Sequence, residues 1–241
     1  MAAALPPLDS DDALFLDFDG SLVEIALNPG DVVVPPSLLA LLQNLDARLG
    51  GALAIISGRP ITDLDVQLAP LQLAAAGEHG AEIRHLKNGA VEPSVDLPVS
   101  AAQQLRELSR QLPGTVLELK TASAALHFRA VPQHEHAAVG GIRALAQQHA
   151  DYELMHGKMV AEFKPAAINK GLALAELVAR SPFAGRRPVF IGDDVTDEAG
   201  FMAVNELGGL SIRVGKVAAT EARYSLADVA AVHCWLEECV E

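Results

Sequence analysis

The sequence from residue 13 to residue 20 reads Ala13-Leu14-Phe15-Leu16-Asp17-Phe18-Asp19-Gly20, an apolar run that ends in two carboxylates and a glycine. Side chains two apart on an extended segment point the same way, so Asp17 and Asp19 are expected to face one pocket at the end of a strand. Two like charges at close range repel each other unless a cation or a shared proton intervenes. The pair therefore suggests metal binding or acid–base chemistry, although an Asp-x-Asp-Gly turn that ends an ordinary strand has the same pattern.

The composition bounds the size of the fold and the kinds of partner. The chain has 241 residues, of which 50% are hydrophobic, enough for one substantial core or for a core and a small second domain. Its formal net charge is −13 and no basic stripe is visible, which argues against nucleic acid as a partner. A small anionic substrate is still compatible, because a few local cations and a metal ion can set the sign of the potential inside a pocket.

Cysteine usage and hydropathy bear on the compartment. Only Cys234 and Cys239 occur, which fits a reducing environment. The start of the chain lacks a basic region followed by a long apolar one, and no later run approaches the roughly 18 apolar residues of a membrane span. The sequence is therefore predicted to be cytoplasmic, without a membrane partner.

Short apolar runs alternate with helical stretches in the first hundred residues, a pattern typical of a parallel sheet with covering helices. Each predicted strand ends in a polar or glycine-containing loop, and such loops meet at the carboxyl edge of the sheet, where open α/β folds bind ligands. The predicted strands are 13–17, 52–56 and 73–76, the predicted helices are 36–49 and one from about residue 61, and the loops are Asp17 to Ser21, Ser57-Gly58-Arg59 and Gly77-Glu78-His79-Gly80.

From about residue 93 to residue 165 the pattern changes to helix, hairpin, helix, hairpin, which describes a self-contained α+β unit with a weak internal repeat. After it the α/β pattern resumes with a helix from Asn169. We therefore expect a core formed by residues 1–95 and 166–241, with residues 96–165 inserted into it. The unit's predicted helices are 100–112 and 135–149 and its strands 115–120, 124–129, 152–156 and 159–164; the core strands that follow are 188–191 and 210–214.

Four sequence features with residue types that serve in catalysis occur in chain order. Taken singly, each has a structural explanation: a serine can cap a helix, a lysine can be solvated, and an aspartate can begin a helix. Taken together they supply the nucleophile, acid–base group, hydroxyl, cation and metal ligands that phosphoryl transfer needs. They are Asp17-x-Asp19-Gly20, Ser57, Lys170 and Gly192-Asp193-Asp194-x-x-Asp197-Glu198.

On these motifs the chain resembles the haloacid dehalogenase superfamily of phosphatases, and its finer features are similar to the trehalose-6-phosphate phosphatases. The resemblance implies a Rossmann-like core with a parallel sheet and an inserted α+β cap, whose two αββ units form one antiparallel sheet. The family usually has threonine where this chain has Ser21, which keeps the hydroxyl. The motifs are 16–22, Ile56-Ser57-Gly58-Arg59, Gly77-Glu78-His79-Gly80, Glu118-Leu119-Lys120, His127-Phe128-Arg129, Asn169-Lys170-Gly171 and 192–198.

The resemblance also implies an activity: Mg²⁺-dependent hydrolysis of trehalose 6-phosphate, the last step of trehalose biosynthesis. Asp17 would form an aspartyl-phosphate, and Asp19 would act first as the acid and then as the base. Ser57 and Lys170 would hold the phosphate oxygens. Mg²⁺ would be bound by the Asp17 carboxylate, the Asp19 backbone carbonyl and Asp193, whereas Asp197 would orient a metal-bound water or Lys170.

The inserted unit carries the substrate prediction. Charged residues two apart on its predicted strands indicate one charged and one apolar sheet face. A solvated face with cross-strand ion pairs would give the same pattern. In the resembled family, the residues matching Glu118, Lys120 and Glu162 bind the sugar remote from the phosphate.

Three core residues, Gly58, Arg59 and His79, are also predicted to bind substrate near the pocket mouth. Two of them have structural alternatives: Arg59 could pair with a nearby acid, and His79 could be held by loop carbonyls.

Other functions fit the same motifs. The chain could be another capped sugar-phosphate phosphatase, of the sucrose-phosphate or mannosylglycerate-phosphate type, or a phosphosugar mutase. It could also be a non-catalytic phosphosugar sensor that regulates a synthase, although the full set of catalytic residue types speaks against this. A trehalose-phosphate synthase is the candidate protein partner.

Overall fold

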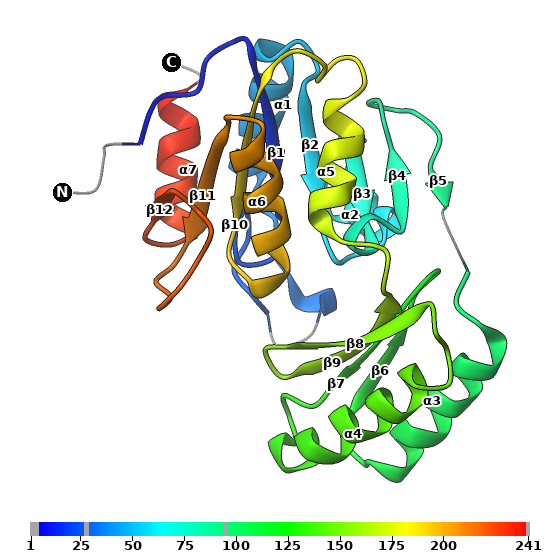
Figure 1. Ribbon diagram of the computed structural model, residues 1–241. Helices are drawn as coiled ribbons and strands as arrows, with labels where there is room; N and C mark the ends of the chain where they lie inside the picture. Colours follow the sequence, from blue (N-terminus) through cyan, green and yellow to red (C-terminus); the bar gives the residue numbers. More distant parts are fainter. Residues whose placement is uncertain (1–4, 27–28, 94–95, 240–241) are drawn as a thin grey trace. The chain divides into compact units, whose positions relative to one another are not determined.

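Two units make up the structure, a computed structural model that describes residues 5–26, 29–93 and 96–239 (Figure 1). The core unit comprises Met1–Glu92 and Asn169–Glu241, and the inserted unit comprises Pro93–Ile168. Residues 94 and 95, where the sequence predicts the first domain boundary, lie outside the described residues.

An eight-stranded sheet forms the centre of the core unit, in the order β12-β11-β10-β1-β2-β3-β4-β5. The pairs from β12 to β3 are parallel, and β4 runs antiparallel to β3. The strands are β1 (Asp12–Leu16), β2 (Leu53–Ile56), β3 (Ala74–Gly77), β4 (Glu82–Arg84), β5 (Glu92–Pro93), β10 (Arg187–Gly192), β11 (Leu210–Val214) and β12 (Tyr224–Leu226); the α-helices are α1 (Pro36–Arg48), α2 (Ile61–Gln67), α5 (Lys170–Val178), α6 (Glu198–Glu206) and α7 (Val229–Glu238).

The strand order reverses between β1 and β10. From β1 the chain moves by way of α1 to β2, and from β10 it moves by way of α6 to β11, in the opposite direction along the sheet. Right-handed crossovers in opposite directions put α1 and α6 on opposite faces, and Figure 1 shows α6 beside α5 in front of the sheet. Loops on either side of such a reversal diverge and leave a crevice at the carboxyl ends of the strands, where ligands bind.

The central strands are buried on both faces, as parallel strands covered by helices must be. Every residue of β1 is buried, and so are those of β2 and β11. Phe15 on β1 packs against Phe183 with ring centroids 5.2 Å apart, and Phe190 on β10 packs against Phe201 of α6 at 5.4 Å. This packing fixes the strand ends that carry the polar loops.

The inserted unit is an antiparallel sheet in the order β6-β7-β9-β8, with two helices on one of its faces (Figure 1). The apolar side of the sheet, including Leu126, Ala161 and Phe163, shares one core with Leu105 of α3 and Ile142 of α4. The predicted order of two αββ units in one antiparallel sheet is confirmed. The elements are α3 (Val99–Gln111), β6 (Val116–Leu119), β7 (Ala124–His127), α4 (Glu135–Ala146), β8 (Tyr152–Gly157) and β9 (Val160–Pro165).

Several elements differ from the prediction. The edge strands β4, β5 and β12 were not predicted, because two or three residues are too few for a periodic pattern. The expectation that Lys120 and Arg129 lie on strands is wrong. A turn closed by the hydrogen bond from Lys120 N to Ser123 O follows β6, and another, from Val131 N to Phe128 O, follows β7.

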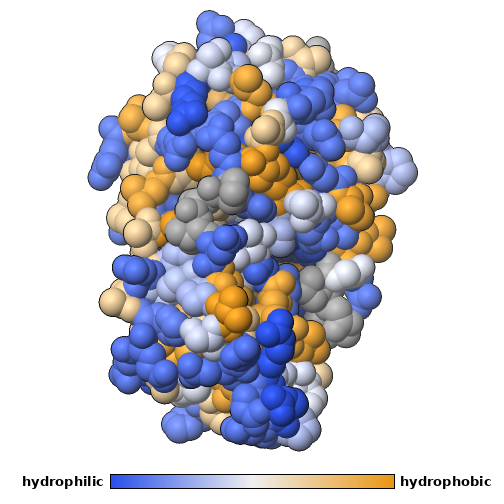
Figure 2. All heavy atoms as spheres, turned by 90° about the vertical axis from the view of Figure 1, so that its right-hand side faces the viewer, coloured by the Kyte–Doolittle hydropathy of each residue, from blue (hydrophilic) through white to orange (hydrophobic). Residues whose placement is uncertain are grey.

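The outer surface contains both polar and apolar side chains. On the face shown in Figure 2, hydrophobic residues form small groups among many hydrophilic ones. Among the described residues, no helix combines the length and the hydrophobicity needed to cross a membrane.

Candidate active site

Asp17 directly follows β1, and its backbone N–H still pairs with β10 through the carbonyl of Ile191, at 2.9 Å. Its side chain is buried and meets Lys170, the first residue of α5, with Nζ 2.6 Å from Oδ1. The same ammonium lies 2.6 Å from Oδ1 of Asp197. Asn169 caps α5 by accepting a hydrogen bond from Leu172 N at 3.0 Å, which fixes the start of the helix that carries Lys170.

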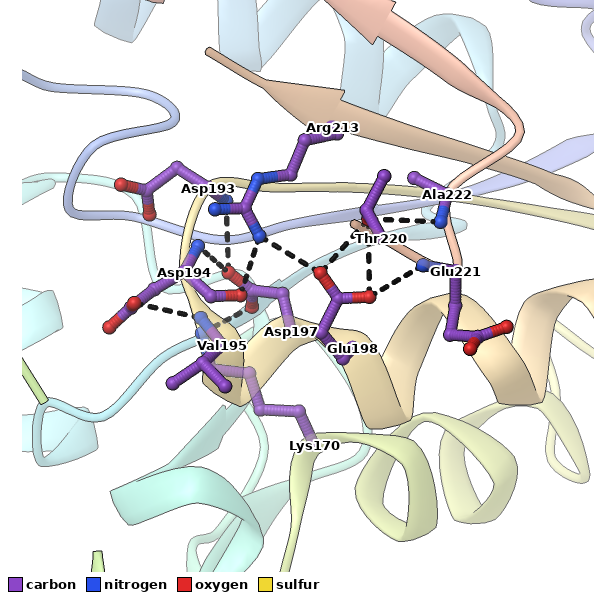
Figure 3. A network of polar contacts seen from close by, with 10 residues as sticks. All are labelled: Lys170, Asp193, Asp194, Val195, Asp197, Glu198, Arg213, Thr220, Glu221 and Ala222. Carbon is purple, nitrogen blue, oxygen red and sulfur yellow. Dashed lines mark hydrogen bonds and ion pairs between the residues drawn. The ribbon is translucent and has the colours of Figure 1, made fainter. Parts of the chain in front are cut away.

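The loop after β10 brings two further carboxylates, Asp193 and Asp197, to Asp17. Figure 3 shows these two residues together with Lys170. Asp197 is fully buried, and its Oδ2 accepts hydrogen bonds from the backbone N–H groups of Asp193 and Asp194, each at 2.9 Å. One ligand atom each from Asp17, Asp193 and Asp197 lies within 4.8 Å of the others. Gly20 has a φ of +85°, and a side chain there would collide with the Asp193 carboxylate, so glycine lets the two loops meet.

The charges of this cluster are only partly balanced. Burial raises the pKa of Asp17 well above its usual value, with Asp197 and Asp193 adding to the effect of burial and Lys170 opposing it. Burial and the charge of Asp197 raise the pKa of Asp193 to about 7. Burial alone would lower the pKa of Lys170, but Asp17 and Asp197 outweigh it, so the pKa is raised and the ammonium stays charged. Three carboxylates around one ammonium suit a hard divalent cation, because such cations prefer oxygen ligands and would remove the remaining repulsion.

The loops after β2 and β3 meet at Ser57, which directly follows β2 and is buried. Its Oγ accepts a hydrogen bond from Arg59 N at 3.1 Å, and its carbonyl accepts one from His79 N at 2.9 Å. Glu78 and His79 have left-handed φ values of 47° and 61°, which costs about 1–3 kcal/mol per residue and is typical of functional loops. A side chain at Gly58 would lie 2.8 Å from the His79 ring, so only glycine fits beneath the imidazole.

Asp19 is held by Arg59 rather than by Asp17 or Lys170. Nε of Arg59 lies 2.6 Å from Oδ2 of Asp19, Nη2 lies 2.7 Å from Oδ1, and Nη1 lies 2.6 Å from Asp63. Burial opposes the charge of Arg59, but the two carboxylates more than offset it and raise its pKa. Both Asp19 oxygens thus accept hydrogen bonds from one guanidinium, a two-bond arrangement that fixes the orientation of the carboxylate.

The inserted unit gathers the three predicted sugar ligands on the face opposite its helices. Glu118 and Glu162 are both in register with Ala125, one on each side of it. Nζ of Lys120 lies 2.9 Å from Oε1 of Glu162, and these two side chains are only 7% and 6% exposed. Lys120 therefore joins the polar face from the turn after β6, although the strand ends before it, and the pair is buried, unlike a solvated surface ion pair.

Glu118 differs from Glu162 in its ion-pair partner and in its exposure. Its Oε2 lies 3.0 Å from Nε2 of His127, and its side chain is 30% exposed. Burial favours its neutral form, but the hydrogen bond to His127 and the charge of Lys120 lower its pKa. Glu118 is thus a charged hydrogen-bond acceptor, which suits recognition of hydroxyl groups.

Comparison with known proteins decides the family. A family model described as trehalose-phosphatase matches residues 15–230. The chain belongs to the trehalose-phosphatase family. The trehalose-6-phosphate phosphatase of Escherichia coli (strain K12) is 44% identical over 236 residues, which cover 96% of this chain and 88% of that protein. Membership of this family makes the chain a phosphomonoester hydrolase, and the resemblance found in the sequence is confirmed.

Two solved structures support the fold. The C-terminal domain of a C. albicans trehalose-6-phosphate phosphatase has a TM-score of 0.82 at 22% identity, with 98% of each chain covered. A phosphatase of the haloalkanoate (HAD) superfamily from Bacteroides thetaiotaomicron has a TM-score of 0.61 at 17% identity, with 97% of this chain and 96% of that one covered. At these identities the similarity concerns the fold, and the predicted fold class is confirmed.

This trehalose-phosphatase family member therefore has a site that the sequence located only in part. The predicted residues Asp17, Lys170 and Asp193 lie in one cluster, and Asp197 contacts Lys170, one of the two groups that it was expected to orient. The partnership of Arg59 with Asp19 and Asp63 was not predicted beyond a general pairing with an acid.

The sequence alone assigns no role to Glu198 or Arg213. Two features of the sequence nevertheless distinguish them: Glu198 ends the 192–198 motif, and Arg213 is a charged residue inside a predicted apolar strand.

Proposed function

We propose that this chain hydrolyses trehalose 6-phosphate to trehalose and inorganic phosphate, with Asp17 as the nucleophile and Mg²⁺ as the cofactor. One observation carries the proposal. Asp17, Lys170, Asp193 and Asp197 come from three separate segments of the chain and are clustered in a buried site at the reversal of strand order. A fold gains nothing from placing two buried carboxylates and a half-buried one beside a single ammonium, which indicates chemistry at this point.

In the first step, an Asp17 oxygen would attack phosphorus, and the bond from phosphorus to the sugar oxygen would break. Asp19, released from Arg59 and protonated, would give its proton to that sugar oxygen, which leaves as the trehalose hydroxyl. In the second step, Asp19 would take a proton from water while the water oxygen attacks phosphorus. Phosphate would then leave and the Asp17 carboxylate would be restored.

The remaining polar residues would bind the transferring group. Lys170 supplies a cation that stays charged, and Ser57 supplies a hydroxyl at the end of the neighbouring strand. Asp17, Asp193 and the backbone carbonyl of Asp19 would hold Mg²⁺, with Asp197 fixing the loop around them. Mg²⁺ when bound would neutralise carboxylate and phosphate charge.

We also propose that residues 96–165 act as a cap that selects the sugar. Glu118, Lys120 and Glu162 would bind the hydroxyl groups of the glucose unit remote from the phosphate, while Gly58, Arg59 and His79 would contact substrate at the core loops. The polar face of the inserted unit supports this, because it combines a charged acceptor with a buried Lys–Glu pair. A trehalose-phosphate synthase would make this substrate and is the protein partner we propose to test.

The direct test is a phosphate-release assay over a panel of sugar phosphates, with Mg²⁺ and after its removal with EDTA. Trehalose 6-phosphate should have the highest kcat/KM, and activity should vanish with EDTA and return when Mg²⁺ is added. Equal or better turnover of sucrose phosphate or glucose 6-phosphate would reject the proposed substrate. Binding of trehalose 6-phosphate without any turnover would instead favour a phosphosugar sensor.

Glu118→Ala tests the role of the inserted unit. Loss of the hydrogen bond that a sugar hydroxyl would donate to this charged acceptor should lower kcat/KM for trehalose 6-phosphate by about 10- to 100-fold, with little change for a small aryl phosphate. Glu107→Ala is the matched control, because Glu107 is an exposed residue of α3 whose ion-pair partner is Arg110. Equal losses on both substrates for Glu118→Ala would mean that Glu118 supports folding instead.

A further inference from the structure

Glu198 is the first residue of α6 and directly follows Asp197, yet its carboxylate takes part in a different set of contacts (Figure 3). Oε1 accepts a hydrogen bond from Arg213 Nη1 at 3.0 Å, and Oε2 accepts one from the backbone N–H of Glu221 at 2.8 Å. The Thr220 hydroxyl lies 2.9 Å from Oε1 and 3.1 Å from Oε2. Both oxygens are thus engaged, and their partners come from β11 and from the segment that follows it.

Arg213 carries this network to the backbone of the predicted metal loop. Arg213 lies on β11 and is buried, and its Nη1 donates both to Glu198 and to the carbonyl oxygen of Asp194, each at 3.0 Å. Figure 3 shows the guanidinium between the Asp194 backbone and Glu198. The Asp194–Val195 peptide, one residue beyond Asp193, is therefore held by a buried cation, which is itself held by Glu198.

The loop from Asp193 to Asp197 is consequently held at two places. The Asp197 carboxylate accepts hydrogen bonds from the N–H groups of Asp193 and Asp194, and the Asp194 carboxylate accepts one from Val195 N at 2.7 Å. Asp194 and Asp197 also form a capping box at the start of the short helix before α6. Arg213 donates to the carbonyl oxygen of Asp194, which also accepts a hydrogen bond from Asp197 N at 3.1 Å. The carboxyl group of Asp193 is attached to the backbone through a single CH2 group. The position of the backbone therefore largely determines where the carboxylate oxygens lie.

A merely stabilising ion pair would be a simpler explanation. Buried ion pairs are weak evidence for stability, since burying the charges costs about as much as their attraction returns. Here the guanidinium bonds a backbone oxygen next to a predicted metal ligand, and Glu198 additionally binds Thr220 and Glu221. Partners that orient metal ligands from outside have this arrangement.

We propose that Glu198 and Arg213 are positioning residues for Mg²⁺ binding by Asp193, and that Thr220 and Glu221 anchor the segment after β11 to the same network. The proposal rests on the proposed function, because it assigns these residues to that metal. Neither Glu198 nor Arg213 is assigned a contact with the substrate phosphate. Their effect would pass through the Asp194 peptide.

The test is the Mg²⁺ affinity of the full-length protein, measured as the dependence of the unfolding temperature Tm on Mg²⁺ concentration, in the absence of substrate. Glu198→Gln removes the charge that orients Arg213 and should weaken Mg²⁺ binding by about 10- to 100-fold. Arg213→Met should do the same, and Arg213→Lys should lose less. At saturating Mg²⁺, kcat of Glu198→Gln should return to within about threefold of the wild type, because its effect is on metal binding.

Asp12→Asn provides the matched control. Asp12 and Arg187 are the first residues of β1 and β10, and their side chains form two hydrogen bonds of 2.8 and 2.7 Å. This pair lies at the amino ends of the strands, away from the loops at their carboxyl ends. This variant should lower Tm without Mg²⁺, as Glu198→Gln does, and leave the Mg²⁺ affinity unchanged. Thr220→Val should weaken Mg²⁺ binding by severalfold, and an unchanged affinity would remove the segment after β11 from the proposal.

An unchanged Mg²⁺ affinity in Glu198→Gln would overturn the inference while leaving the proposed function intact, provided that the wild type binds Mg²⁺ and releases phosphate. A wild type without Mg²⁺-dependent phosphatase activity would overturn the proposed function itself. If Arg213→Met does not fold, Arg213→Lys and Glu198→Gln still decide the matter, since both keep the size and polarity of the replaced side chain.

Discussion

Asp17→Asn is expected to reduce phosphate release from trehalose 6-phosphate by about 10⁴-fold or more, while the protein remains folded. The amide has nearly the shape of the carboxylate, but it is a poor nucleophile and carries no charge for a metal ion. Its burial also matters for stability. Because burial raises the pKa of Asp17, the folded state bears a cost for the charged form that the neutral amide avoids, so Tm should stay close to that of the wild type.

The measurement is single-turnover phosphate release at saturating Mg²⁺, with circular dichroism to establish the folded state. Asp46→Asn is the matched control. Asp46 is another buried carboxylate of the core unit, and its ion-pair partner Lys87 is partly exposed. That variant should retain kcat within about threefold. Wild-type turnover by Asp17→Asn would reject the nucleophile, and an equal loss in both variants would attribute the effect to folding.

The parts of the structure that the sequence predicts well have a long or repeated signal. The runs from Ala13 to Leu16 and from Pro188 to Ile191 both form strands buried on both faces, as continuous apolar residues predict. The helix–hairpin repeat of the inserted unit is equally readable. Asp17, Ser57 and Asp193 follow predicted strands directly. The sequence alone therefore predicts that they lie together, since parallel strands have their carboxyl ends at the same side of the sheet.

What the sequence does not predict depends on side-chain direction. Nothing in the spacing of Asp19 and Arg59 indicates that a guanidinium takes both oxygens of the expected acid–base group, and Asp63 adds a third contact that only the packing of α2 makes possible. The roles of Glu198 and Arg213 likewise depend on β11 lying beside β10. Strand order is a long-range property, which local patterns do not encode.

Lys170→Met is expected to cause the second large effect, in stability as well as in activity. Lys170 is only 3% exposed and is the ammonium between Asp17 and Asp197, so its removal leaves two buried carboxylates without their cation. Breaking a buried pair in this way costs about 3–5 kcal/mol of unfolding free energy. Turnover should fall by about 10³-fold or more, because the phosphate would lose its cation as well.

The stability loss should depend on pH in a defined direction. Burial raises the folded-state pKa of Asp17, and the loss of Lys170 removes the charge that opposes this shift, so Asp17 has a higher pKa in the folded than in the unfolded state. Such groups bind protons more tightly in the folded state, so their stabilising effect is present at low pH and is lost as pH rises through the folded pKa. Urea unfolding should therefore find Lys170→Met closer to the wild type at pH 5 than at pH 7.5.

Two further variants make this prediction specific. Lys170→Met combined with Asp197→Asn should recover part of the lost stability at pH 7.5, because one uncompensated charge is removed, but it should not recover turnover. Lys87→Met, which breaks the pair with Asp46, should cost less, since Lys87 is 39% exposed and water can take its place. A stability loss in Lys170→Met that is the same at both pH values, or that Asp197→Asn deepens, would mean that the lysine contributes packing rather than charge.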